Sequence, residues 1–181
     1  MKTKQIKIIF LSITGAFFLV SCASASLKNV AFNADRINLN GDISKLNGSY
    51  ANKSENSNCC GYPLDHCLDF EYNHCDSVTI KAIDSSHVKI MLMRHDTIIK
   101  SREMHVKLYD NCIYLHNNKA MPMLIINIFR NQLTRISILN NGDINVDSAD
   151  ETMVFLAILP ITGGRNSEYD LRFKKISACK P

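Results

Sequence analysis

The feature that most constrains the fold is an alternation of apolar and polar residues that runs along the chain from Cys75 onward. Val78, Ile80 and Ala82 alternate with polar residues, and the same pattern returns after a short Asp-Ser-Ser turn at residues 84–86. A period of two is typical of strands with one buried face, and short strands separated by turn residues are typical of an antiparallel meander. Over the whole chain we expect nine or ten strands and no amphipathic helix after residue 21.

We expect this pattern to give an all-β domain. The expected strands cover residues 68–72, 78–82, 88–92, 104–108, 113–115, 124–129, 133–139, 144–146, 153–159 and 169–175. A meander that closes on itself removes the exposed edges that invite pairing with other chains. The prediction is therefore a single antiparallel meander of about 8–10 strands that closes into a small barrel or half-barrel.

The turn at residues 110–111 predicts one pairing register. Asp-Asn has the residue types of a two-residue hairpin loop, and such a loop sets Leu108 against Ile113 and His105 against His116. Apolar residues then meet across the hairpin, and the two histidines become cross-strand neighbours. This pair suits a metal ion or a pH-sensitive contact, although on a solvated sheet face ordinary surface histidines are the expected interpretation.

The turn at residues 140–142 allows two registers. A two-residue Asn-Gly loop sets Ile138 against a polar residue, whereas a three-residue loop sets Ile138 against Ile144 and also pairs Arg135 with Asp147. A slip of one residue would turn every apolar side chain to the wrong face. We therefore predict the three-residue loop, with its glycine in the left-handed conformation.

The segment 153–159 is apolar on both faces, unlike its neighbours. We expect a strand of this kind to lie in the centre of the sheet with both faces covered; the alternative is a patch for a partner or ligand. Further along, Gly163-Gly164-Arg165 has residues suited to holding an anion but no following helix, so we interpret it as a hairpin loop.

The amino terminus has the three parts of a bacterial export signal. Three lysines precede an apolar run at residues 8–20, which is too short for a permanent span, since a hydrocarbon core needs roughly 20 apolar helical residues. Leu-Val-Ser-Cys at residues 19–22 resembles the lipobox of bacterial lipoproteins, in which the cysteine receives diacylglycerol before the signal is cut in front of it. This resemblance implies a signal peptide at residues 1–21 and a lipid on Cys22.

Acylation of Cys22 with two or more chains would give stable membrane attachment. The absence of Asp directly after it favours the outer membrane, facing the periplasm, by resemblance to known sorting rules. Polar residues 22–45 suit a flexible tether, and the folded domain is expected at residues 46–181. Without the signal lysines, 18 basic residues stand against 17 acidic ones, a net charge of about +1 that lacks the footprint of a nucleic-acid-binding protein.

The segment Leu-Asn-Gly-Ser-Tyr-Ala-Asn at residues 46–52 resembles the opening of small Bacteroidetes-type lipoproteins of unknown function, whose mature domains continue as β-meanders. The likeness extends through residues 88–101 and 114–125 and covers most of the mature chain. The Gly-x-Tyr within this opening is also similar to the Gly-x-Trp start of lipocalins. The resemblance implies a lipocalin-like barrel or half-barrel and brings no established activity with it; the chain departs from the pattern in a cysteine-rich segment at residues 52–75.

Six cysteines remain besides the lipid anchor, and they are candidates for disulfides. An even number of cysteines in an oxidising envelope compartment favours bridges. The six are Cys59, Cys60, Cys67, Cys75, Cys112 and Cys179. We expect two bridges within residues 59–75 and one that involves Cys112 or Cys179, with no bond between adjacent Cys59 and Cys60.

A metal site is the weaker alternative for the same segment. His66-Cys67 and His74-Cys75 repeat eight residues apart, and imidazole and thiolate are zinc ligands. No Cys-x-x-Cys pair is present, however, so we predict no cofactor. Catalysis by a free thiol would need a lowered pKa and a positioned base, and the sequence offers no recognisable catalytic constellation.

The expected function is that of a membrane-anchored cell-envelope lipoprotein with a non-enzymatic binding or structural role. One version binds an apolar small molecule inside the barrel, and another is an interaction or assembly factor for envelope proteins. A metal- or thiol-dependent enzyme comes third. The implied partners are the membrane, through the lipid on Cys22, and an apolar ligand or envelope protein, but not nucleic acid.

Overall fold

The computed structural model describes residues 27, 35–56, 62–70, 74–123, 125–157 and 159–176. Within these residues the chain forms one nine-stranded antiparallel sheet in the order β8-β7-β6-β5-β4-β3-β2-β1-β9. The strands are β1 (Gly48–Ala51), β2 (Ser77–Ala82), β3 (His87–Arg94), β4 (Thr97–Tyr109), β5 (Cys112–Pro122), β6 (Ile126–Ile138), β7 (Ile144–Leu156), β8 (Leu159–Phe173) and β9 (Lys175–Ile176). Two short helices accompany them, η1 (Ile43–Leu46) and α2 (Leu64–Cys67). The predicted all-β meander is confirmed.

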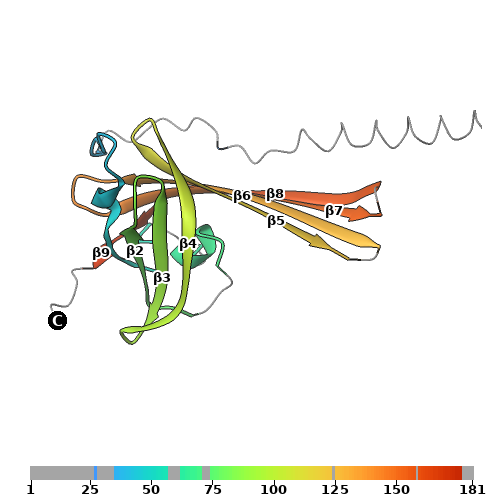
Figure 1. Cartoon of the computed structure of the whole chain (residues 1–181), viewed down its shortest axis with the longest axis horizontal. Helices are drawn as coiled ribbons and strands as arrows, with labels where there is room; N and C mark the ends of the chain where they lie inside the picture. Colours follow the sequence, from blue (N-terminus) through green and yellow to red (C-terminus); the bar gives the residue numbers. More distant parts are fainter. Residues whose placement is uncertain are drawn as a thin grey trace, which may run out of the picture.

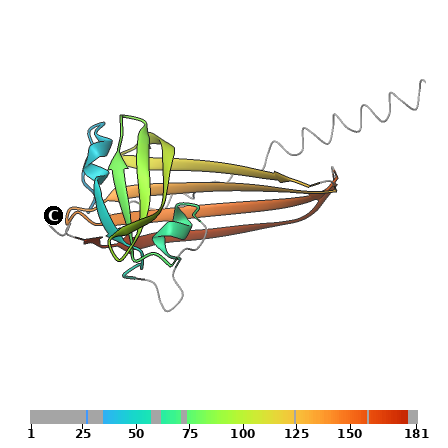
Figure 2. The ribbon, with the colours of Figure 1, turned by 60° about the horizontal axis from the view of Figure 1, so that its bottom comes forward.

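The sheet has two parts of very different shape (Figures 1 and 2). Strands β1–β4 curl around an interior together with the near halves of β5–β8, and we call this part the body. The far halves of β5–β8 project from it as four long strands, and we call residues 117–131 and 149–167 the finger. Strands β4 and β5 pair only through residues 106–109 and 112–115, so the finger begins where β5 leaves β4.

The predicted closure into a lipocalin-like barrel is wrong. Strand β8 pairs with β7 along most of its length, whereas β9 pairs with β1 only through Ser49 with Ile176 and Tyr50 with Lys175. Strands β8 and β9 lie at opposite edges of the sheet and follow each other in the chain. The two edges are therefore connected at one point only, next to Lys174. Unequal strand length explains why: β8 has 15 residues and β1 only 4, so most of the β8 edge finds no partner in β1.

The interior of the body is filled by side chains. The largest fully buried ones are Tyr50, Phe173, Leu39, Leu46, Leu64, Leu68, Ile80, Ile90, Leu92, Ile113, Ile136 and Ile144. Leu39 and Ile43 belong to this core, so the folded part reaches back beyond residue 46 toward the amino terminus. Removal of this apolar set from water is the main source of stability for the body.

The segment that carries the family resemblance, residues 46–52, organises one end of the core. The Tyr50 hydroxyl is buried and donates to the carbonyl of Leu46 at 2.8 Å. Asn52 accepts from the backbone N–H of Asp65 at 2.9 Å and donates to the carbonyl of Cys75 at 3.1 Å. The segment thus connects the start of α2 to Cys75, just before β2, and its distinctive residues have structural roles.

The cysteine-rich segment folds inward as helix α2 and a turn, so the predicted strand at residues 68–72 is wrong where the structure describes it. The backbone N–H of Leu68 donates to the carbonyl of Leu64 at 3.1 Å, and that of Phe70 donates to the carbonyl of Asp65 at 2.9 Å. Neither N–H group is therefore available for pairing with another strand. The last carbonyls of α2 accept from β6, where Gln132 donates to the carbonyl of Cys67 at 3.1 Å.

Both predicted hairpin registers are confirmed. The loop at residues 110–111 sets Leu108 against Ile113, and the loop at residues 140–142 sets Ile138 against Ile144. In the second loop the glycine has a φ of 89°, as the three-residue arrangement requires.

Strands β6 and β7 each span two of the predicted strands, because the polar stretch expected as a loop between them is paired within the sheet. Arg130 bonds Asp150, and Arg135 bonds Asp147. These pairs carry the ladder through stretches that look like loops in the sequence. The interpretation of residues 163–165 as a hairpin loop is also wrong, since they lie inside β8 opposite β7.

Candidate interaction site

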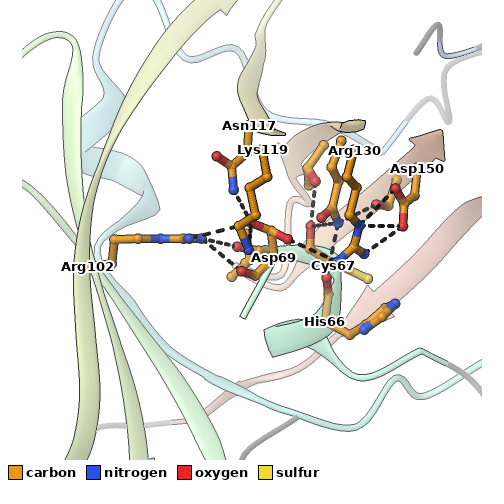
Figure 3. Close-up of polar contacts among 12 residues, drawn as sticks. His66, Cys67, Asp69, Arg102, Asn117, Lys119, Arg130 and Asp150 are labelled. Atoms are coloured by element: carbon orange, nitrogen blue, oxygen red, sulfur yellow. Dashed lines mark hydrogen bonds and ion pairs between the residues drawn. The ribbon is translucent and has the colours of Figure 1, made fainter. Parts of the chain in front are cut away.

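Between the body and the finger, one buried carboxylate contacts three basic side chains (Figure 3). The side chain of Asp69 is only 4% exposed, and its Oδ2 lies 2.7 Å from Lys119 Nζ. Arg102 Nη1 is 3.5 Å from the same oxygen, and Arg130 Nη1 is 3.4 Å from Oδ1. Together with Asp150, which also binds Arg130, we call these five residues the root cluster.

The root cluster offsets a repulsion between two like charges within the sheet. Lys119 and Arg130 are direct cross-strand partners on β5 and β6, and like charges in this position repel. Asp69 enters from the α2 turn and neutralises part of that charge. Asp150 contacts Arg130 Nε and Nη2 at 2.6–3.0 Å, and these hydrogen bonds raise the pKa of Arg130 above its ordinary value. The four charges therefore hold one another in place.

Arg102 connects the same cluster to the body. Its Nη2 donates to the carbonyl of Leu68 at 2.7 Å, and its guanidinium lies 4.5 Å from the centre of the Phe70 ring. Since Arg102 is on β4 while Lys119 and Arg130 are on β5 and β6, the turn that carries Asp69 is bonded to both parts of the molecule. The root cluster thus fixes how the finger is joined to the body.

The far end of the finger is apolar. Eight large apolar side chains there are 41–65% exposed. They are Met121, Met123, Ile125, Ile126, Phe129, Leu156, Leu159 and Ile161, and we call them the tip. The expected double burial of the strand at residues 153–159 is therefore wrong, because Leu156 and Leu159 are among the exposed residues; the alternative of an apolar patch agrees with the structure.

The tip is apolar on both faces of the sheet. Successive residues of a strand point to opposite faces, so Ile126 lies on the face of Arg130 and Phe129 lies on the other. Leu156 is the cross-strand partner of Ile126, which extends the first apolar face onto β7. On the second face, Phe129 packs edge-on against Phe155 with ring centres 5.4 Å apart.

The backbone at the tip is tied together across the two hairpins. Met123 N–H donates to the carbonyl of Ile126 at 2.9 Å, and Ala157 N–H donates to the carbonyl of Ile125 at 2.5 Å. The Asn127 side chain then donates to the carbonyl of Ala157 at 3.0 Å. The one polar side chain in this stretch of β6 thus serves a backbone group of the neighbouring hairpin.

Three of the disulfide candidates, Cys67, Cys75 and Cys112, are buried free thiols. Burial raises the pKa of Cys67 to about 12 and that of Cys75 to about 12, and it also raises the pKa of Cys112. These thiols are protonated at neutral pH and are therefore poor nucleophiles. None of the expected bridges is therefore formed by Cys67, Cys75 or Cys112. Cys59, Cys60, Cys179 and Cys22 lie outside the described residues, so the lipid anchor stays a prediction.

The weaker metal alternative receives no support within the described part of the chain, where no three His, Cys, Asp or Glu side chains gather as a metal site. His66 stacks on Tyr62 with ring centres 4.8 Å apart. The Cys75 thiol lies 3.5 Å from Asp65 Oδ2. Two of the candidate ligands, His66 and Cys75, thus have other contacts.

The two histidines predicted as a cross-strand pair both line a groove of about 460 Å³ on the β4–β5 side. The ladder ends at Val106 and Leu115, one position before them. His105 instead packs edge-on against His87, with ring centres 5.3 Å apart, and His116 Nε2 lies 2.7 Å from Asn131 Oδ1. The divergence of β4 from β5 separates the predicted pair.

Sequence reasoning missed the root cluster. Asp69 lies in a segment expected to be a stapled loop with a short strand, and its basic partners come from three strands far apart in the sequence. A signal was present in β6, where Arg130, Gln132 and Thr134 occupy alternate positions on the face that carries buried Ile136. Three polar residues on an inward face indicate buried polar partners.

No family model, curated protein or solved structure matches this chain. The resemblance to Bacteroidetes-type lipoproteins and to lipocalins therefore stays a prediction. Neither helix in the described ranges has the length and apolar character that crossing a membrane would require.

Proposed function

We propose that this chain is a cell-envelope lipoprotein, anchored through Cys22, with a non-enzymatic binding role and with the tip of the finger as its binding element. The observation that carries the proposal is the exposure of eight large apolar side chains at the end of a projecting sheet. Exposed apolar patches of this kind mark interaction surfaces in soluble domains.

The joint between body and finger supports this choice. A projecting sheet can present a binding surface only if its direction is held, and the root cluster supplies that restraint from four strands and the turn after α2. The exported, lipid-anchored address comes from the lipobox-like segment at residues 19–22, and an envelope location places the tip among other envelope components.

The other expected versions have less support. An apolar ligand inside a barrel would need an open interior, whereas large side chains such as Tyr50, Leu64 and Phe173 are fully buried in the body. A thiol enzyme would need an ionised cysteine, and burial keeps Cys67 and Cys75 protonated at neutral pH.

Two measurements in intact cells test the proposal. Metabolic labelling with a clickable fatty acid should mark the wild-type chain and not the Cys22→Ser variant. A photo-crosslinking amino acid at Leu159 should give a discrete adduct, whereas the same group at Ile83, an exposed apolar residue beside β2 that is 51% exposed, should give none. An unlabelled wild type would overturn the anchor, and equal crosslinking at both positions would overturn the role of the tip.

A further inference from the structure

We propose that the tip inserts into the outer part of a lipid bilayer, so that the protein holds its membrane at two points, the acylated Cys22 and the end of the finger. This inference rests on the proposed function and names the partner of the same tip. Four properties of the tip carry it.

The first property is the absence of charge. Residues 120–129 and 153–164 contain no Asp, Glu, Lys or Arg, and both faces of the sheet are apolar there. A protein partner normally covers one face of a sheet, whereas a lipid phase surrounds a projecting element on every side. Exposed apolar residues on both faces therefore favour lipid.

The second property is the pairing of the loop backbone. Unpaired N–H and C=O groups are costly in hydrocarbon. In the tip, Met123 donates to Ile126 and Ala157 donates to Ile125, while Asn127 donates to the carbonyl of Ala157. Each edge strand also ends near a proline, Pro122 in β5 and Pro160 in β8, which has no N–H to expose.

The third property is the height of the uncharged tip. From Arg130 to Ile126 the strand rises by about 14 Å at roughly 3.4 Å per residue, close to half of a hydrocarbon core of about 30 Å. The uncharged stretch is therefore no taller than one leaflet. The outer edges of β5 beyond Leu115 and of β8 along the finger have no strand partner in the described sheet, and open edges are costly in hydrocarbon. Insertion is therefore limited to the interfacial layer, where water and headgroups reach these backbone groups.

The fourth property is the reach of the tether. The continuous described part of the chain begins at Asp35. Its carbonyl accepts from the backbone N–H of Asn140, at the end of the sheet opposite the tip. The thirteen residues from Cys22 through Ala34 span at most about 43–47 Å when extended, and the thirteen residues of β6 span about 44 Å. The segment is therefore long enough, when fully extended, to let the lipid on Cys22 reach the level of the tip. Because the anchor makes insertion intramolecular, weak affinity at the tip is sufficient.

The chain contains no tryptophan, so a single introduced tryptophan reports its own environment. We would place it by Leu159→Trp at the tip and by Ile83→Trp in the body, two positions that are 65% and 51% exposed and therefore tolerate the change. Full-length lipidated chains are reconstituted into phosphatidylcholine–phosphatidylglycerol vesicles. We expect a blue-shifted emission for Leu159→Trp, quenched by lipids brominated on the acyl chain, and neither effect for Ile83→Trp.

A second measurement uses a chain that begins at Ala23, with neither the apolar run at residues 8–20 nor the anchor, in a vesicle flotation assay. The added pair Leu159→Ser and Ile161→Ser should weaken flotation roughly tenfold or more, since burial of one such side chain is worth about 1.5–3 kcal/mol. The matched Ile83→Ser change should leave flotation unaltered.

Emission from Leu159→Trp that stays at the solvent wavelength in vesicles would overturn lipid insertion. A blue shift that appears without lipid and grows with protein concentration would also overturn it, in favour of a second copy of the chain at the tip. If the tip crosslinks to a protein in cells while lipid quenching is absent, the proposed binding role stands and the lipid inference falls.

Discussion

The body and the finger belong to one sheet, yet their apolar residues lie in opposite environments. On β3 in the body, Val88, Ile90 and Leu92 alternate into a core that excludes water almost completely. At the end of the finger, Leu156 and Leu159 remain in contact with solvent. Apolar side chains in the body therefore stabilise the fold, whereas those at the tip contribute little to it.

The two parts also differ in what joins their strands. The body is stabilised by apolar burial, while the middle of the finger is linked by ion pairs such as Arg130 with Asp150. A sheet that projects beyond its core cannot rely on side-chain burial, so the ladder itself and cross-strand pairs maintain it. The comparison can be tested by making the same substitution in each part.

The largest difference is expected for loss of a leucine side chain. Leu92→Ala in the body should lower the free energy of unfolding by about 2–5 kcal/mol, because it removes buried methyl groups and leaves a cavity. Leu159→Ala at the tip should change it by less than about 0.5 kcal/mol. Equilibrium unfolding in guanidinium chloride measures both. Equal losses would mean that the tip is buried in solution.

The next largest effect is expected at the joint. Asp69→Asn leaves three basic side chains without their shared carboxylate, and because those cations are partly exposed we expect a loss of about 2–3 kcal/mol. Hydrogen exchange should also accelerate in β5 and β6. Asp170→Asn is a matched control, since Asp69 and Asp170 have φ values of 57° and 56°, and its exposed pair with Arg172 at 3.9 Å is worth at most about 0.5 kcal/mol. Equal losses of stability in the two variants would show that the root cluster does not stabilise the joint between body and finger.

Local patterns in the sequence predicted the pairing of this sheet better than its extent. The registers at residues 110–111 and 140–142 follow from two-residue alternation and turn chemistry, both of which act over a few residues. Barrel closure depends instead on the relative length of β1 and β8, and the length of β7 depends on ion pairs such as Asp147 with Arg135. A stretch of charged residues in the middle of a strand has the composition of a loop, and the sequence does not show the ion pairs that hold it in the sheet.

The candidate site, too, was predictable only where local patterns in the sequence determine it. The apolar character of residues 153–159 marked them as unusual, but whether a strand is covered depends on neighbours that periodicity does not reveal. Asp69 gave no signal of its own, because its partners Arg102 and Lys119 become neighbours only when the α2 turn folds inward. Pairing across such sequence separations is a tertiary property.

A pH-dependent effect is expected from Cys67, the last residue of α2. Burial raises the pKa of this thiol from 9.0 to about 12, so the unfolded chain ionises first, and stability that is present below pH 9 is lost as the pH rises toward 12. From pH 8 to pH 10 one free thiol should contribute a loss of about 1.4 kcal/mol. The unfolding free energy of the wild type should therefore fall by this much more than that of Cys67→Ala. Equal falls would indicate that Cys67 is in a disulfide rather than free.

The smallest effect separates a turn of the body from an edge of the finger. Gly142 has a φ of 89° with only ordinary contact for an added Cβ, at 3.6 Å from Lys175, so Gly142→Ala should cost about 1 kcal/mol through backbone strain alone. Gly164 lies in the β8 edge, where an added Cβ meets nothing within 4 Å. Gly164→Ala should be neutral or stabilise the chain by up to about 1 kcal/mol, because it restricts the unfolded state. Thermal unfolding of both variants measures these effects. A marked loss of stability for Gly164→Ala would show that another group packs against the open edge of the finger. The edge would then be covered, as the interior of the body is, and this contrast between the two parts would be wrong.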